Sequence, residues 1–263
     1  TLTTRDDTRM PLPRSPLASR TVHVFLRPPE PSQVQDQSLI VIDTLRATTV
    51  STTLIAGGAD AIYPCAAVDE ARTLANQISG AQLCGERGGL PPEGFAFGNS
   101  AVEFHQASVA GWKMVQCTSN GTRALRLARA ADRTLVGCLR NRDAVARAVL
   151  EMPGDIAIVC SGEHEGQRPS VEDTFTAGAV VETLVGLEPS VGLGPGARLA
   201  RRIFQAYGRN GTTAFQDAPH AEILRDLGFH DDLAFAAEMD VEECVPVAFV
   251  DDEARIRIAR ELP

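Results

Sequence analysis

An acid, an arginine and a run of hydroxyl side chains follow one short apolar segment of this sequence. Residues 39–42 read Leu-Ile-Val-Ile, which predicts a β-strand buried on both faces, and Asp43 ends the run. Arg46 and six threonine or serine residues lie within the next ten positions, in a helical stretch that stops at Gly57. In parallel α/β sheets, ligands bind beyond the carboxyl ends of strands, where a helix N-terminus favours an anion. The pattern therefore predicts an anion-binding or acid–base site centred on Asp43.

Three other predicted strands end in polar turns, at residues 86–89, 118–123 and 161–173. Right-handed crossover connections are expected to leave all four turns along one edge of the sheet, so that groups distant in sequence converge. An acid that ends a four-residue aliphatic strand is costly to bury without a partner, and Arg46 or a metal ion could supply one. We therefore expect Asp43 to be the centre of the site.

Chemistry on a phosphomonoester fits these residue types. Arginine forks and close-approaching backbone N–H groups bind phosphate oxygens, and carboxylates hold a divalent cation. As catalytic residues we predict Asp43, Arg46, Glu86 and Arg123; as phosphate-binding residues Thr48, Thr49, Arg87, Gly88, Thr118, Ser119, Asn120 and Gly121; and as Mg²⁺ ligands Asp43, Glu172 and Asp173. Taken singly, Glu172 is also an ordinary acid in the first turn of a helix, where it stabilises the helix dipole. The residues leave open whether Asp43 is a nucleophile or a metal ligand.

Four motifs together resemble a known family, the 2-phosphosulfolactate phosphatases. They are VIDTLRATTV (41–50), GERGG with EGFAFGNS (85–89 and 93–100), TSNGTRAL (118–125), and IVCSG followed by SVEDTFTAG (158–162 and 170–178). The resemblance implies an α/β/α fold and Mg²⁺-dependent hydrolysis of 2-phospho-3-sulfolactate to 3-sulfolactate and phosphate, a step toward coenzyme M. Two departures from the family pattern are the charged stretch 163–169 and Ala101 where proline is expected. A phosphatase for another small phosphorylated acid is the nearest alternative.

Rival functions use some of the same residues. Cys117 and Arg123 have the C-x5-R spacing of phosphatases that use a cysteine thiolate, although their loop contains one glycine and not several. His164 is a candidate general acid, but a solvated loop histidine is the simpler interpretation. A non-catalytic binder of a small anionic metabolite would use the arginines and glycines without the clustered acids. A dinucleotide-dependent oxidoreductase is disfavoured because no G-x-G-x-x-G follows the early strands.

Composition and charge restrict the class of protein. The chain has 263 residues with 25 basic and 34 acidic side chains, and the net charge of −9 disfavours binding to nucleic acid or to an anionic membrane. No apolar run approaches the roughly eighteen residues of a membrane span, and the start lacks a secretory signal, so we expect a cytoplasmic protein. The six cysteines are expected to be reduced.

The predicted organisation is a flexible N-terminal tail (1–20) followed by one α/β phosphatase domain (21–263). The expected fold is a three-layer α/β/α sandwich with a mostly parallel sheet, and weak similarity among its strand-turn-helix units is consistent with two similar intertwined halves. Residues 188–239 are predicted to form a helical elaboration that closes over or beside the sheet. The expected partner is a small phosphorylated substrate, and a sulfonate group on that substrate is compatible with the sequence. Assembly into a homo-oligomer is compatible with the sequence as well.

Overall fold

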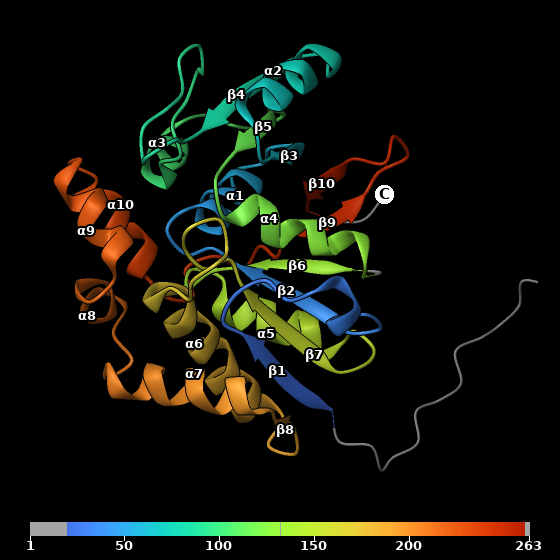
Figure 1. The fold of residues 1–263 in the computed structure, drawn as a ribbon, viewed down its shortest axis with the longest axis vertical. Coiled ribbons are helices and arrows are strands. Elements are labelled where there is room, and N and C mark those ends of the chain that lie inside the picture. The colour runs from blue at the N-terminus through green and yellow to red at the C-terminus, as the bar shows by residue number, and fades with distance from the viewer. Residues whose placement is uncertain (1–19, 132, 261–263) are drawn as a thin grey trace, which may run out of the picture.

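A computed structural model describes residues 20–131 and 133–260, so residues 1–19 of the predicted tail lie outside the described part. Within that part, ten strands form one sheet in the order β4-β5-β3-β10-β9-β6-β2-β7-β1-β8 (Figure 1). The strands are β1 (Thr21–Phe25), β2 (Ser38–Ile42), β3 (Ala61–Cys65), β4 (Ala81–Gly85), β5 (Lys113–Cys117), β6 (Thr134–Gly137), β7 (Ile156–Cys160), β8 (Gly192–Leu193), β9 (Val247–Val250) and β10 (Ile256–Ala259). The expectation of an α/β fold with a mostly parallel sheet is confirmed.

The helices alternate with the strands over most of the chain and then follow one another without strands. They are α1 (Ala47–Ala56), α2 (Val68–Gln77), α3 (Ala101–Gln106), α4 (Gly121–Leu125), α5 (Arg142–Leu150), α6 (Val171–Leu187), α7 (Pro195–Ala206), α8 (Gly211–Gln216), α9 (Pro219–Asp226) and α10 (His230–Ala237), with 3₁₀ turns η1 (Pro31–Gln33) and η2 (Arg126–Arg129). None of the helices in the described ranges has the length and apolar character of a membrane span.

The sheet consists of two parallel blocks joined by an antiparallel hairpin. Strands β6, β2, β7, β1 and β8 form one block, and β4, β5 and β3 form the other. The hairpin β9–β10 is inserted between β6 and β3, and all three pairings across it are antiparallel. The two blocks therefore run in opposite directions. Contrary to the prediction from right-handed crossovers, the four polar turns do not all lie along one edge of the sheet.

The twist of the sheet nevertheless brings the two sets of strand ends together. In Figure 1 the carboxyl ends of β2 and β5 approach each other near α1 and α4. The contact is direct at Gly121, where an added Cβ would lie 2.7 Å from the Asp43 Oδ2 atom and 2.7 Å from the Ala47 Cβ atom. Only glycine leaves room for this approach. The turns after β2 and β5 therefore converge as predicted, although the two strands belong to different blocks of the sheet.

Alternate residues of β2 pack into different layers, as the two-residue period of a strand requires. Leu39 and Val41 belong to one buried cluster with residues of α1, α3 and α4, whereas Ile40 and Ile42 belong to a second cluster with residues of α5, α6 and α7. All five residues of β2 are buried. The sheet is therefore covered by helices on both sides, and the three-layer prediction is confirmed.

Residues 188–239 supply β8 and the four helices α7–α10. Helix α7 packs on α6 and β1, whereas α8, α9 and α10 form a third apolar cluster that includes Leu45, Leu139 and Phe175. Leu45 comes from the turn after β2, so these helices cover the carboxyl end of that strand. In Figure 1 they lie at the left of the sheet, beside the strand ends. We call helices α8–α10 the helical cap.

Candidate active site

Asp43 is fixed between the end of β2 and the start of α1. The residue is 5% exposed, and the Ala47 N–H group donates to its Oδ1 atom at 3.0 Å. The Thr48 hydroxyl accepts a hydrogen bond from the Asp43 N–H group at 2.9 Å and donates one to the Asp43 carbonyl oxygen at 2.9 Å. The Thr49 hydroxyl donates to the Thr44 carbonyl oxygen at 2.7 Å. The two threonines predicted to bind phosphate are therefore engaged in holding the turn around Asp43.

The electrostatic environment of Asp43 opposes its ionisation. Burial is the main cause, and the nearby charge of Asp173 is the next; together they raise the pKa of Asp43 from 3.8 to about 7. The N–H group of Ala47 at the start of α1 acts in the opposite direction. A carboxyl group with a pKa near neutrality is suited to proton transfer, and a cation placed beside it would favour its ionised form.

Asp173 approaches from the other side of β2. Its Oδ1 atom accepts the Thr44 N–H group at 2.8 Å, and its Oδ2 atom accepts the Ser161 hydroxyl at 2.9 Å and the Gly162 N–H group at 3.1 Å. Burial raises the pKa of Asp173, while these donors lower it. The turn after β7 and the first turn of α6 thus place a second carboxylate close enough to Asp43 for the two charges to interact.

Glu172, the third predicted metal ligand, is oriented differently from Asp173. Its carboxyl group is buried, burial raises its pKa well above the usual value, and its Oε2 atom has no hydrogen-bond partner among the described residues. It does not line the cavity next to Asp43. In the described ranges no group of three or more acidic, histidine or cysteine side chains is placed to hold a metal ion.

Glu86 joins the turns that follow β4 and β5. Its Oε1 atom accepts both the N–H group and the hydroxyl of Ser119, each at 3.1 Å, and its Oε2 atom accepts the Gly89 N–H group at 3.1 Å. Gly88 and Gly89 have φ values of 60° and 86°, a left-handed conformation that favours glycine. The carboxylate therefore fixes the shape of two of the four predicted turns.

A cavity of about 170 Å³ lies where these turns meet Asp43. The lining residues come from β2–α1, from the turns after β4 and β5, and from the helical cap. They are Asp43, Leu45, Arg46, Ala47, Glu86, Gly88, Gly89, Asn99, Thr118, Ser119, Asn120, His220 and Ile223. The structure thus brings together Asp43, Arg46, Glu86, Gly88 and residues 118–120 of the predicted site.

Arg46 is the arginine of this cavity, and its side chain is 2% exposed. Its Nη2 group donates to the Gly89 carbonyl oxygen at 2.9 Å, and its guanidinium carbon lies 4.2 Å from the centre of the Phe229 ring. Its Nη1 atom is 3.9 Å from the Asp232 Oδ2 atom and has no hydrogen-bond partner among the described residues. A buried guanidinium with an unused donor beside a cavity is suited to bind an anionic oxygen.

The other two predicted arginines point elsewhere. Arg87 donates to the Glu86 carbonyl oxygen at 2.6 Å and to the Cys117 Sγ atom at 3.1 Å. Arg123 is exposed, and its Nη2 atom lies 2.5 Å from the Glu165 Oε2 atom. Neither arginine lines the cavity. The sequence alone could not predict these contacts, because neither a backbone carbonyl group nor an acid on a distant exposed loop forms a recognisable sequence pattern with an arginine.

The cysteine-based alternative lacks its geometry. Cys117 is fully buried, and burial raises the pKa of its thiol, so a thiolate is disfavoured. Arg123, which would have to sit above the thiolate, instead pairs with Glu165. His164 also lies outside the cavity, with its side chain 61% exposed. The cavity is built around Asp43 and Arg46.

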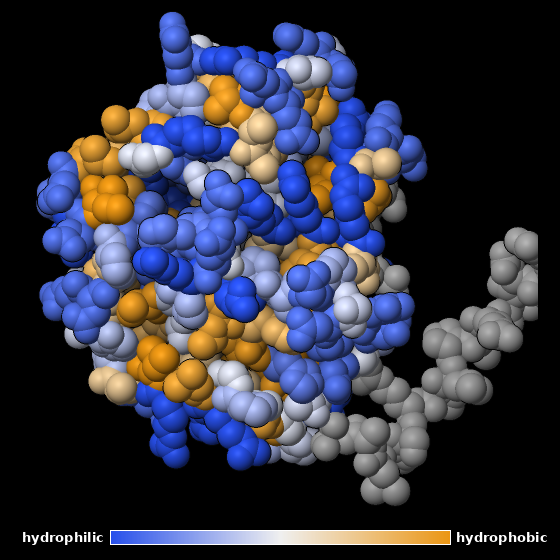
Figure 2. All heavy atoms as spheres, viewed as in Figure 1, coloured by the Kyte–Doolittle hydropathy of each residue, from blue (hydrophilic) through white to orange (hydrophobic). Residues whose placement is uncertain are grey.

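Two residues of the helical cap complete the cavity and were not among the predicted site residues. His220 and Ile223 come from α9, and burial lowers the pKa of His220, which favours the neutral imidazole. The cap packs directly on the turn after β4, since a Cβ added to Gly89 would lie 2.5 Å from the Leu227 Cδ1 atom. Figure 2 shows apolar surface over α9 and α10, where Ile223 is 49% exposed. The only signal in the sequence was a polar residue at the start of a helix, which is too common to identify a site.

A buried acid pair, a buried arginine with a free donor and a small cavity at strand ends define an α/β enzyme that acts on a small anion. Comparison with known proteins identifies the family. Residues 26–249 match the family model described as 2-phosphosulpholactate phosphatase. The chain therefore belongs to this family, and it is a phosphatase, a hydrolase of phosphoric monoesters.

Relatives from several bacteria are similar over most of their length, and each is named "Probable 2-phosphosulfolactate phosphatase". The protein of Symbiobacterium thermophilum is 35% identical over 83% of this chain and 94% of its own. That of Thermotoga petrophila is 34% identical over 86% of this chain and 94% of its own. That of Deinococcus radiodurans is 35% identical over 81% of this chain and 88% of its own. The resemblance stated from the four motifs is confirmed.

Proposed function

We propose that this protein is a Mg²⁺-dependent phosphatase that converts 2-phospho-3-sulfolactate and water to 3-sulfolactate and phosphate. Family membership and the names of the relatives support the substrate. The observation that supports the chemistry is the buried carboxyl group of Asp43, whose pKa is raised by burial and by the charge of Asp173, at a cavity that also contains Arg46. We further propose that the reaction takes place in the cytoplasm and contributes to coenzyme M formation, as the resemblance implies.

The donor set around Asp43 fits a magnesium ion. Mg²⁺ in phosphoryl-transfer sites is bound by one or two carboxylates, together with water and substrate phosphate. Asp43 supplies one such group at the cavity, which Glu86 also lines, whereas both carboxylate oxygens of Asp173 accept N–H or hydroxyl groups and Asp173 does not line the cavity. A cation would also relieve the repulsion that raises the pKa of Asp43. When bound, Mg²⁺ would polarise the phosphoryl group and offset its negative charge.

The protein's own groups would position the substrate. Arg46 would donate to a phosphoryl oxygen, and it is held in place by Gly89 and Phe229. Ser119 and Asn120 line the opposite side and supply hydroxyl and amide groups. Glu86 holds the backbone of that side in shape. These groups are already oriented in the folded protein, so little reorganisation is needed when the substrate binds.

Asp43 is placed to act on the phosphorus centre in one of two ways. As a nucleophile its carboxylate would attack phosphorus, release the sulfolactate alkoxide and form an acyl phosphate that water then hydrolyses. As a base or metal ligand it would orient the water that attacks phosphorus, and the sulfolactate alkoxide would leave and take up a proton. The two routes differ in whether the phosphoryl group becomes covalently attached to Asp43 during a single turnover. Mass spectrometry of the peptide that contains Asp43 separates them.

A phosphatase for another small phosphorylated acid is the second candidate, and one observation favours it. Arg46 is the only arginine that lines the described cavity, so a second anionic group on the substrate has no arginine of its own there. Phosphate release from 2-phospho-3-sulfolactate, phospholactate and p-nitrophenyl phosphate tests this point. Preference for the sulfonated substrate supports the proposal, and equal or better turnover of phospholactate supports the second candidate.

A further inference from the structure

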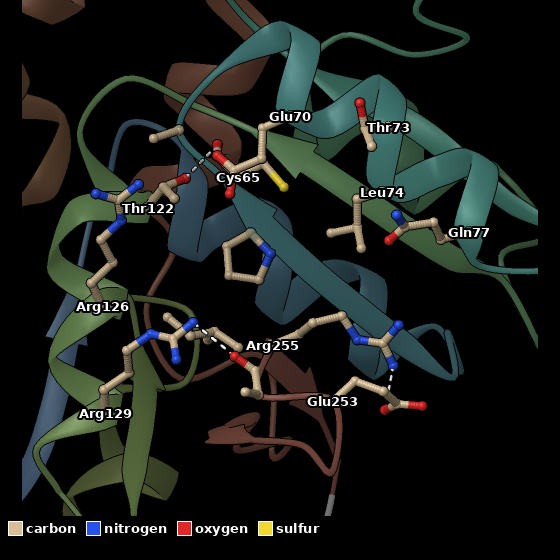
Figure 3. Close-up of a pocket in the computed structure, with 14 residues that line it drawn as sticks. Cys65, Glu70, Thr73, Leu74, Gln77, Thr122, Arg126, Arg129, Glu253 and Arg255 are labelled. Carbon is tan, nitrogen blue, oxygen red and sulfur yellow. Dashed lines mark hydrogen bonds and ion pairs between the residues drawn. The ribbon is translucent and has the colours of Figure 1, made fainter.

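A second cavity lies outside the phosphatase site. It has a volume of about 690 Å³ and is bounded by α2, the end of β3, the segment α4–η2 and the turn between β9 and β10 (Figure 3). Binding sites for drug-sized ligands typically have volumes of roughly 300–1,000 Å³. The cavity is thus large enough for a metabolite of nucleotide size, whereas the phosphatase cavity is about 170 Å³.

One wall of this larger cavity carries two arginines without acidic partners. Arg126 and Arg129 lie three residues apart on η2, a spacing that places both side chains on the same side of a 3₁₀ turn. Arg129 donates to the Ala254 carbonyl oxygen at 2.9 Å, and neither arginine forms an ion pair within residues 20–131 and 133–260. Arg255, by contrast, is paired with Asp251 at 2.9 Å and with Glu253 at 2.6 Å. Both side chains are exposed, and arginine forks without an acidic partner are suited to bind an anionic ligand.

The opposite wall has a different character. In Figure 3 Leu74 and Gln77 face the arginines from α2, and Glu70 lies near the start of the same helix. Leu74 offers apolar surface, whereas Gln77 and Glu70 offer hydrogen-bonding groups for the uncharged part of a ligand. An inorganic ion would contact only the arginine wall. A ligand that carries phosphate at one end and a larger polar or planar group at the other would contact both.

We propose that this cavity is a second binding site, which takes an organic phosphate of nucleotide size. Arg126 and Arg129 bind the phosphate, and α2 contacts the rest of the ligand. The site lies directly behind the phosphatase cavity. Thr122 in its wall donates to the Cys65 carbonyl oxygen at 3.0 Å and lies 3.1 Å from the hydroxyl of Thr118, which lines the other cavity. The proposal concerns binding alone and does not depend on the proposed reaction.

Isothermal titration of the full-length protein with AMP, in EDTA to prevent turnover, tests the proposal. We expect saturable binding at one site, and in the double variant Arg126→Ser with Arg129→Ser a loss of affinity of about tenfold or more, because two charge-assisted contacts are removed. The matched control replaces two exposed arginines on α5 and α7, Arg147 and Arg202, with serine, and it should bind AMP as the wild type does. Basal phosphate release should be unchanged in both.

A second variant and a second probe make the result decisive. Thr73→Tyr, on the exposed side of α2, places a bulky ring in the cavity and should also weaken AMP binding, even if the arginine variant is poorly folded. Inorganic phosphate should bind much more weakly than AMP. Absence of AMP binding, or equal AMP affinity in the two cavity variants and the wild type, would overturn the proposal. Equal affinity for inorganic phosphate and AMP would contradict the assignment to an organic phosphate.

Discussion

Replacing Asp43 with asparagine separates the electrostatic role of this residue from its shape. Asp43 is 5% exposed, and its pKa is raised from 3.8 to about 7, first by burial and then by the charge of Asp173. Between these two values the unfolded chain has lost the proton while the folded protein retains it. Stability therefore falls as pH rises through this window, and above a pH of about 7 the full penalty is present. Asparagine carries no charge and removes the penalty.

The size of the effect follows from the shift. A rise of about 3 pKa units corresponds to about 4 kcal/mol at about 1.4 kcal/mol per unit. Because Asp43 and Asp173 titrate as an interacting pair, we expect about half of this, roughly 2 kcal/mol, to be recovered by the substitution. For a chain of this size the gain raises Tm by roughly 4–8 °C. Asparagine also retains an oxygen that can accept the Ala47 N–H group.

Thermal unfolding of Asp43→Asn and wild type in EDTA, at about pH 8 and about pH 4, measures this difference. We expect the variant to be more stable at the higher pH, to have almost the same Tm at the lower pH, and to have no turnover with Mg²⁺. Asp252→Asn, an exposed aspartate in the turn between β9 and β10, is the matched control and should leave Tm and turnover unchanged. A variant that is less stable than the wild type at pH 8 would refute the reasoning, because the charge of Asp43 would then be stabilised by its surroundings.

Three further predictions concern the cavity. Arg46→Met should lower kcat/KM by about 10²-fold or more, because the phosphoryl oxygens lose a charge-assisted donor; steady-state kinetics with an effect below threefold would remove Arg46 from substrate binding. His220→Ala should raise KM by about tenfold, since it removes one hydrogen-bonding group of the helical cap, and an unchanged KM and kcat would exclude that contact. Cys117→Ser should leave kcat within about twofold of the wild type because the thiol is buried and protonated; abolished turnover in a folded variant would restore the thiolate mechanism.

Short sequence patterns predicted the centre of the site, because the residues that form it are close together along the chain. An aliphatic run that ends in an acid and leads into a helix specifies β2, Asp43 and α1 within nineteen residues, 38–56. The paired turns at Glu86 and Ser119 were also recognised from their motifs. Each of these features depends on residues near one another along the chain, where strand and helix periodicity applies.

Long-range features were not accessible in the same way. The hairpin β9–β10 comes from the end of the described chain yet lies in the middle of the sheet, and it reverses one block relative to the other. Strand β10 was not predicted, because four residues are too few for the alternation of apolar and polar side chains to be a clear signal. The partners of Arg87 and Arg123, and the entry of His220 into the cavity, depend on side-chain directions that only the packed fold determines.

The most direct test of the central claim is phosphate release from 2-phospho-3-sulfolactate by the wild type and by Asp43→Asn, with Mg²⁺ and again after EDTA. The account predicts metal-dependent release by the wild type and none above background by the folded variant. Release that resists EDTA, or that survives the loss of the Asp43 carboxylate, would contradict the proposal that Mg²⁺ and Asp43 carry the reaction.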